Sequence, residues 1–76
     1  MSAAAHMAQA AAAAVKITST GLLLEANEKN YMAACITQNR GEQARLREER
    51  HTLTDVLLDQ RGEQQHYYRL AILSTR

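Results

Sequence analysis

The stretch from Leu24 to Gly41 constrains the fold of this 76-residue chain more than any other part of it. Apolar or small side chains at Leu24, Tyr31, Ala34 and Cys35 share one face at helical spacing. Gly41 stands where a helix favours a left-handed C-terminal cap, because glycine adopts a positive φ without steric penalty. The stretch therefore predicts a helix over about 20–40 that stops at Gly41, after which the chain folds back.

A second helix is expected over about 42–60. Glu42 and Gln43 stand in its first turn, where the helix dipole favours acidic and neutral side chains. The apolar stripe that would pack against the first helix is Leu46, Leu53, Val56 and Leu57. These two segments predict an all-α fold built on a helical hairpin.

A second joint is expected at Gly62, because the tetrapeptide Arg-Gly-Glu-Gln occurs at 40–43 and again at 61–64. A short third helix would then cover about 63–75. A different interpretation stays open, since 21 residues are three heptads and the helices would then run through the glycines as one long coiled coil.

The N-terminal residues 1–18 are expected to form an alanine-rich tail or marginal helix with a linker. Alanine has the highest helix propensity, but an isolated helix of this length is marginal in water. The alternative is a helix packed closely in a groove. The hydroxyl-rich stretch 16–21 is the expected linker, and Ser19 or Thr20 the expected N-cap of the helix that follows. Residues 19–76 would form the single helical-hairpin module.

Composition narrows the classes of partner. A net charge of +1 with interleaved signs gives no basic field, so no direct nucleic-acid binding is expected. The single cysteine, Cys35, cannot form an internal disulfide, which favours a reducing, intracellular compartment. The first basic residue is Lys16, unlike the basic start of leader peptides, and no run is apolar enough to predict a membrane span.

No catalytic, cofactor-binding or metal-binding residues are predicted. His6, His51 and His66 are far apart in the sequence and none belongs to a zinc-binding pattern. Cys35 lies among apolar residues, with no partner that marks it as a nucleophile. We therefore expect a protein that is not an enzyme and needs no cofactor.

The apolar residues are few for a chain that must fold alone, because it contains no Phe and no Trp, and we expect only about a dozen of its large aliphatic or Tyr side chains to be available for a core. We therefore expect a small accessory or scaffold subunit that completes its core against larger proteins. Association with further copies of the same chain, as a homo-oligomer, is compatible with this expectation. The alternative is a self-associating coiled coil or a structural component of an organellar or cytoskeletal complex. The expected interface residues are Leu22, Leu23, Leu24, Tyr31, Leu46, Leu53, Leu57, Tyr67 and Leu70.

The first hairpin also resembles the N-terminal homology region of the SSXT family of transcriptional coactivators. The matching residues are Leu24, Asn27, Gln38, Asn39, Gly41, Leu53 and Leu57. Gly62 departs from the family pattern, and the long glutamine-rich coactivator tail is missing. The resemblance implies a helical hairpin without catalysis that docks on subunits of a chromatin-remodelling complex or on a transcription factor in the nucleus.

Overall fold

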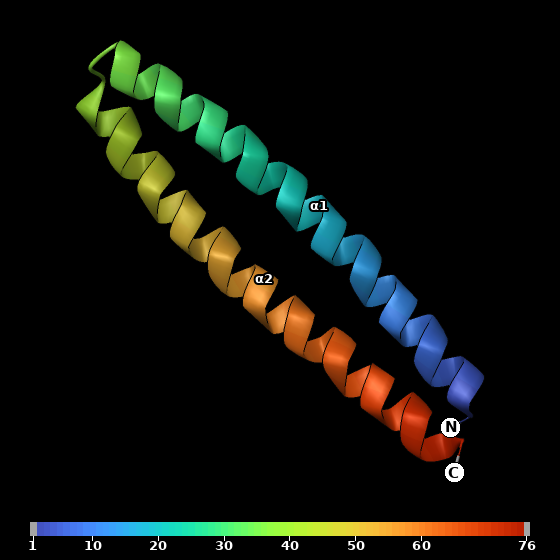
Figure 1. Ribbon diagram of the computed structural model, residues 1–76. Coiled ribbons are helices and arrows are strands. Elements are labelled where there is room, and N and C mark those ends of the chain that lie inside the picture. Colours follow the sequence, from blue (N-terminus) through green and yellow to red (C-terminus); the bar gives the residue numbers. More distant parts are fainter. Residues whose placement is uncertain (1, 76) are drawn as a thin grey trace.

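The computed structural model describes residues 2–75 as two long antiparallel helices (Figure 1). Helix α1 covers Ala3–Ile36 and helix α2 covers Arg40–Ser74. They lie side by side in a rod of 57 × 14 × 12 Å, with both chain ends at the pole opposite the turn (Figure 1). The predicted all-α helical hairpin is confirmed, and its arms are longer than expected.

The turn is formed by Thr37, Gln38 and Asn39. The amide of Asn39 donates to the Ala34 oxygen at 2.9 Å and the amide of Gln38 donates to the Cys35 oxygen at 3.1 Å. This pair of bonds closes the C-terminus of α1 as a Schellman motif, which needs one residue in the left-handed region. That residue is Gln38, with φ 56°.

The predicted left-handed cap at Gly41 is therefore wrong. Gly41 is the second residue of α2 and has no positive φ. The reason is the side chain of Asn39, whose Oδ1 accepts from the Glu42 amide at 3.1 Å and caps α2, so that the helix begins at Arg40, two residues earlier than expected.

The joint predicted at Gly62 and the separate third helix at 63–75 are also wrong. Helix α2 continues through Gly62 to Ser74. A glycine inside a helix costs about 1 kcal/mol relative to alanine. That local cost is outweighed because Gln60, Gln64, Tyr67 and Ala71 continue the buried or half-buried side of α2 past the glycine at helical spacing.

The alanine-rich start is part of α1, so the predicted linker at 16–21 and the break between residues 18 and 19 are absent. Helix α1 begins at Ala3, where Ser2 Oγ accepts from the Ala5 amide at 3.2 Å. Neither Ser19 nor Thr20 is an N-cap. Buried Ala10 and Ala13 show why this segment is helical: small side chains let it pack against the far half of α2.

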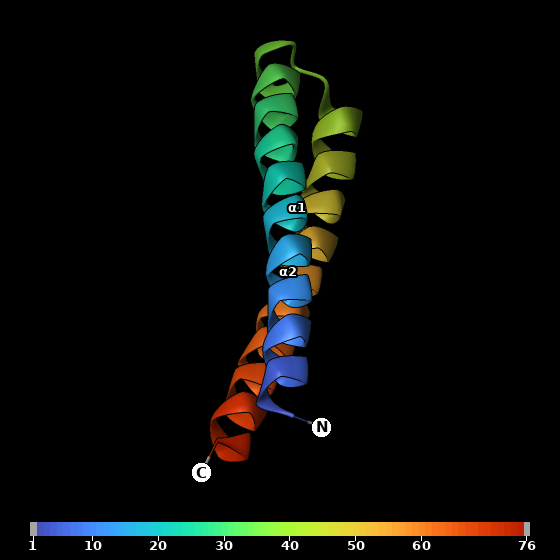
Figure 2. The same cartoon turned by 90° about the vertical axis from the view of Figure 1, so that its right-hand side faces the viewer.

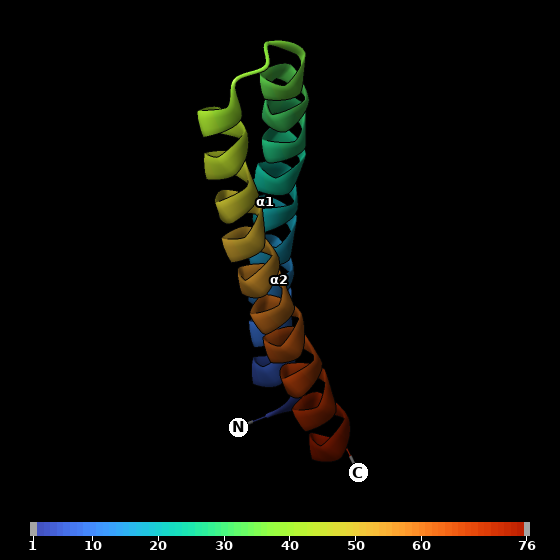
Figure 3. The ribbon, with the colours of Figure 1, turned by 90° about the vertical axis from the view of Figure 1, so that its left-hand side faces the viewer.

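The line of contact between α1 and α2, which we name the inner seam, follows a heptad spacing. Five of the six buried residues of α1 are separated by seven positions each: His6, Ala13, Thr20, Asn27 and Ala34. A seven-residue repeat makes paired helices wind around each other. Figures 2 and 3 show α2 crossing from one side of α1 to the other along the rod. The helices run through Gly21 and Gly62, as the alternative of long continuous helices expected, but the turn at 37–39 divides the chain into a hairpin.

Candidate interaction surface

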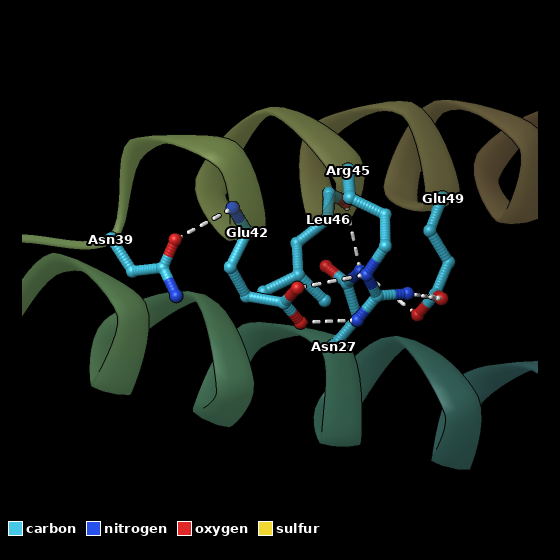
Figure 4. Close-up of polar contacts among 6 residues, drawn as sticks. All are labelled: Asn27, Asn39, Glu42, Arg45, Leu46 and Glu49. Atoms are coloured by element: carbon cyan, nitrogen blue, oxygen red, sulfur yellow. Dashed lines mark hydrogen bonds and ion pairs between the residues drawn. The ribbon is translucent and has the colours of Figure 1, made fainter.

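The inner seam contains a buried asparagine that bonds the two helices together (Figure 4). Asn27 Nδ2 donates to the Leu46 main-chain oxygen at 2.9 Å and to Glu49 Oε1 at 3.1 Å. Asn27 and Leu46 are each 1% exposed. A buried polar group whose hydrogen bonds exist in one register only fixes that register, so Asn27 aligns the two helices.

An ion-pair chain on the surface of α2 leads to this contact (Figure 4). Arg45 bonds to both carboxylate oxygens of Glu42 and, through Nη1 at 3.2 Å, to Glu49 Oε2. The hydrogen bond from Arg45 holds the pKa of the Glu42 carboxyl below its ordinary value, and Glu42 raises the pKa of the Arg45 guanidinium. Glu49 thus joins an exposed charge pair to the buried amide of Asn27.

Other polar contacts cross the inner seam on either side of Asn27. Thr20 Oγ1 donates to Gln60 Oε1 at 2.8 Å, and Gln43 Nε2 donates to the Ala34 oxygen at 3.2 Å. Near the open end, Lys16 Nζ lies 3.9 Å from a Glu63 carboxylate oxygen. These contacts set the alignment of the arms along most of their length.

His6 lies at the open end of the inner seam and is 7% exposed. Its Nδ1 is buried and has no hydrogen-bond partner among the described residues. A buried nitrogen without a partner lowers stability, so His6 is a local cost at this end of the seam.

Most of the predicted interface residues belong to the inner seam. Leu46 is buried, while Leu24, Tyr31, Leu53, Leu57, Tyr67 and Leu70 are half-buried on α1 and α2. Tyr31 also lies under the Arg47 guanidinium, 6.0 Å from the ring centroid, in a cation–π contact between the helices. Only Leu22 and Leu23 of the predicted set point outward, with 62% and 56% of their surface exposed.

A second face of α1, which we name the outer stripe, was not anticipated. Residues two apart on a helix point in nearly opposite directions, because successive side chains are rotated by about 100° around the helix axis. Leu22 is two residues from both Thr20 and Leu24, which lie on the inner seam, so Leu22 points away from α2. Residues alternately three and four apart continue that face: Ala5, Ala8, Ala12, Val15, Ser19, Leu22, Ala26, Lys29, Ala33 and Ile36. All of them are exposed except the half-buried Ala5.

The corresponding face of α2 is polar. Glu48, Asp55, Gly62 and Arg69 follow one another at seven-residue spacing, and all four are exposed. The exposed apolar side chains of α2 are Val56, Leu58, Tyr68, Ile72 and Leu73, and of these Leu58 and Ile72 share the far face with Asp55, Gly62 and Arg69. The hairpin is therefore asymmetric: α1 is apolar on both sides, whereas α2 is apolar towards α1 and mostly polar on its far side.

Residues 2–75 contain no group of three or more His, Cys, Asp or Glu side chains arranged to hold a metal ion, and no pocket. Cys35 is exposed. Helix α1 is long and apolar enough, by length and composition alone, to cross a membrane, which differs from the expectation of no such segment. Core helices of soluble proteins and signal sequences have the same property, so it assigns no membrane location by itself.

Comparison of the chain with protein-family models, with curated proteins and with solved structures finds no match. The surface therefore has to be interpreted from its own geometry.

Proposed function

We propose that this chain is a non-catalytic helical-hairpin subunit that acts by binding other protein surfaces. The observation that carries the proposal is the imbalance between buried and exposed apolar side chains. Among residues 2–75 the buried apolar residues are four alanines and Leu46, whereas eleven large apolar side chains are exposed. Six of the eleven belong to α1 and five to α2, and an exposed apolar surface of this extent is typical of protein interaction sites.

The polar contacts of the inner seam support a role as a rigid docking element. Asn27, Thr20 and Gln43 bond across the two helices and hold them in one alignment. A partner would therefore meet a preformed surface and would lose little further conformational entropy on ordering it.

The thermal stability of the full chain at low concentration tests this proposal. We expect the dilute monomer to melt at low temperature or over a broad range by circular dichroism, because Leu46 is the one large apolar side chain that is fully buried among residues 2–75. Stability should then rise when a protein covers α1. A dilute monomer, verified by sedimentation, that melts cooperatively at high temperature would contradict the proposal.

A narrower candidate is an SSXT-like coactivator hairpin that docks on a nuclear complex. What favours it is that Gln38 and Asn39, two of the residues that carry the resemblance, form the turn between the arms. Partner identification by affinity purification of a tagged full chain, followed by mass spectrometry, would test it. We expect chromatin-remodelling subunits to be recovered with the wild-type chain. Asn39→Ala should abolish their recovery, whereas the exposed control Asn30→Ala should not.

A further inference from the structure

The outer stripe of α1 separates small from large residues in a regular way. One set of positions, seven apart, carries only small side chains: Ala5, Ala12, Ser19, Ala26 and Ala33. The other set, also seven apart, carries Ala8 followed by four larger side chains: Val15, Leu22, Lys29 and Ile36. Val15, Leu22 and Ile36 are 67%, 62% and 81% exposed. The alternation of three and four residues is the spacing by which one helix packs against another.

This arrangement is complementary to itself when two α1 helices run antiparallel. In antiparallel helix pairs, a position of one set faces a position of the other set. The resulting layers are Ala5 with Ile36, Ala8 with Ala33, Ala12 with Lys29, Val15 with Ala26, and Ser19 with Leu22. Every large side chain then faces a small one, and only the Ala8–Ala33 layer pairs two small residues.

A parallel, in-register arrangement lacks this complementarity. Identical residues would face each other, so Leu22 would meet Leu22 while Ala12 and Ala26 would leave gaps. The two copies of Lys29 would also be brought together, and like charges at close range are destabilising. Charge and shape therefore both favour the antiparallel arrangement.

The size of the outer stripe suits a dimer. From Ala5 to Ile36 it extends about 47 Å at 1.5 Å per residue. A strip about 10 Å wide on each copy gives about 900 Å² in total, slightly below the roughly 1,000 Å² at which specific interfaces begin. Leu23, 56% exposed, lies next to the centre of the stripe and adds to that area.

We propose that the outer stripe of α1 is the interface of an antiparallel homodimer, with its two-fold axis at the level of Thr20 and Gly21. The assembly is a layer of four helices in the order α2, α1, α1, α2, in which the two α1 helices meet in the middle and the charged faces of α2 point to solvent. This inference rests on the proposed function as an interaction subunit and names a second copy of the chain as one partner.

A bilayer is a poorer occupant of the same face. In the hairpin, α1 carries α2 with it along its whole length, and α2 exposes Glu48 and Asp55 among other charges. Charged groups are costly in hydrocarbon, whereas in the dimer they remain in water.

Sedimentation equilibrium of the full chain and of two matched variants tests the dimer. Leu22→Glu places a carboxylate of each copy beside the two-fold axis, and we expect it to weaken dimerisation by roughly 100-fold or more. Leu58→Glu makes the same change at a comparably exposed position of α2 and should leave the dimer intact. A monomeric wild-type chain, or a dimer that Leu22→Glu leaves unchanged, would overturn the proposal.

Cross-linking tests the orientation. In a Cys35→Ser background, chains carrying Ala8→Cys and chains carrying Ala33→Cys are mixed and treated with a short bis-maleimide. We expect cross-links between the two kinds of chain and none within either kind alone. Cross-linking of each variant with itself would show a parallel pair and would contradict the proposal.

The outcomes separate this inference from the proposed function. A chain that stays monomeric and weakly stable overturns the homodimer but leaves a role in binding other proteins. A dimer whose dilute monomer is already highly stable supports the homodimer and contradicts the incomplete core. A monomer that instead sediments with vesicles of phosphatidylcholine and phosphatidylglycerol overturns both.

Discussion

Asn27 and Leu46 are joined across the hairpin: the side-chain amide of one donates to the main-chain oxygen of the other at 2.9 Å, where both residues are almost fully buried. We expect Asn27→Ala to lower the free energy of unfolding by about 2 kcal/mol, because it removes two hydrogen bonds and leaves a cavity. The exposed Asn30→Ala is the matched control, since both changes raise helix propensity alike. Urea melts that show equal effects at the two positions would refute a structural role for Asn27.

The left-handed residue of the turn is a glutamine, which offers a route to higher stability. We expect Gln38→Gly to raise the free energy of unfolding by about 1 kcal/mol, because glycine adopts φ 56° without the penalty that a Cβ brings. Gln65→Gly, at an exposed position inside α2, should instead lower it by about 1 kcal/mol. Thermal melts that moved in the same direction for both variants would contradict the turn geometry.

A substitution at Gly62 distinguishes a continuous helix α2 from the chain with a joint at Gly62 that the sequence predicts. Gly62→Ala should stabilise the hairpin by about 1 kcal/mol, because a Cβ at this position would have no heavy atom within 4 Å and alanine favours the helix. Ellipticity at 222 nm and the melting temperature measure the effect. A fall in both would indicate a joint at this position after all.

The pH dependence of stability reports on the Glu42–Arg45 pair. Because the pKa of Glu42 is lowered in the folded chain, its contribution is fully present above the ordinary value of 4.5 and is lost as the pH falls through the folded value. Wild type should therefore be more stable than Glu42→Gln at pH 7, and the difference should shrink in acid and at high salt. A difference that persisted unchanged at pH 2 would point to a cause other than this charge.

The position of the turn could be predicted from sequence because Gln38, Asn39 and Gly41 are residue types that favour helix ends. Which of them adopts the left-handed conformation could not, since Asn39 serves as the N-cap of α2 and leaves that conformation to Gln38. Local preference identifies the turn, while the competition between two caps decides its details.

That both helices are uninterrupted could not be predicted from local helix preference either, for a different reason. Gly62 and the hydroxyl-rich segment at 16–21 each weaken a helix locally, but contacts between residues far apart in sequence, such as Thr20 with Gln60, hold the helix through them. Interactions of this range are not visible in a pattern read along one chain.

The outer stripe could not be predicted from apolar residues alone, because more than half of it consists of small side chains, most of them alanine. Ala12, Ala26 and Ala33 carry little hydrophobic area each, and they become informative only when their spacing is compared with that of Val15, Leu22 and Ile36. The heptad spacing of the exposed face was therefore the available signal, and the seven-residue period of the buried face pointed to it.

Both chain ends lie at one pole of the rod and the turn lies at the other (Figure 1). In an antiparallel pair, the turn of each copy would lie beside the chain ends of the other. The dimer would then have the chain ends of one copy at each pole of the rod. A domain attached to a terminus would therefore occur twice, once at each pole. Such an arrangement holds two attached objects at a fixed separation and facing away from each other.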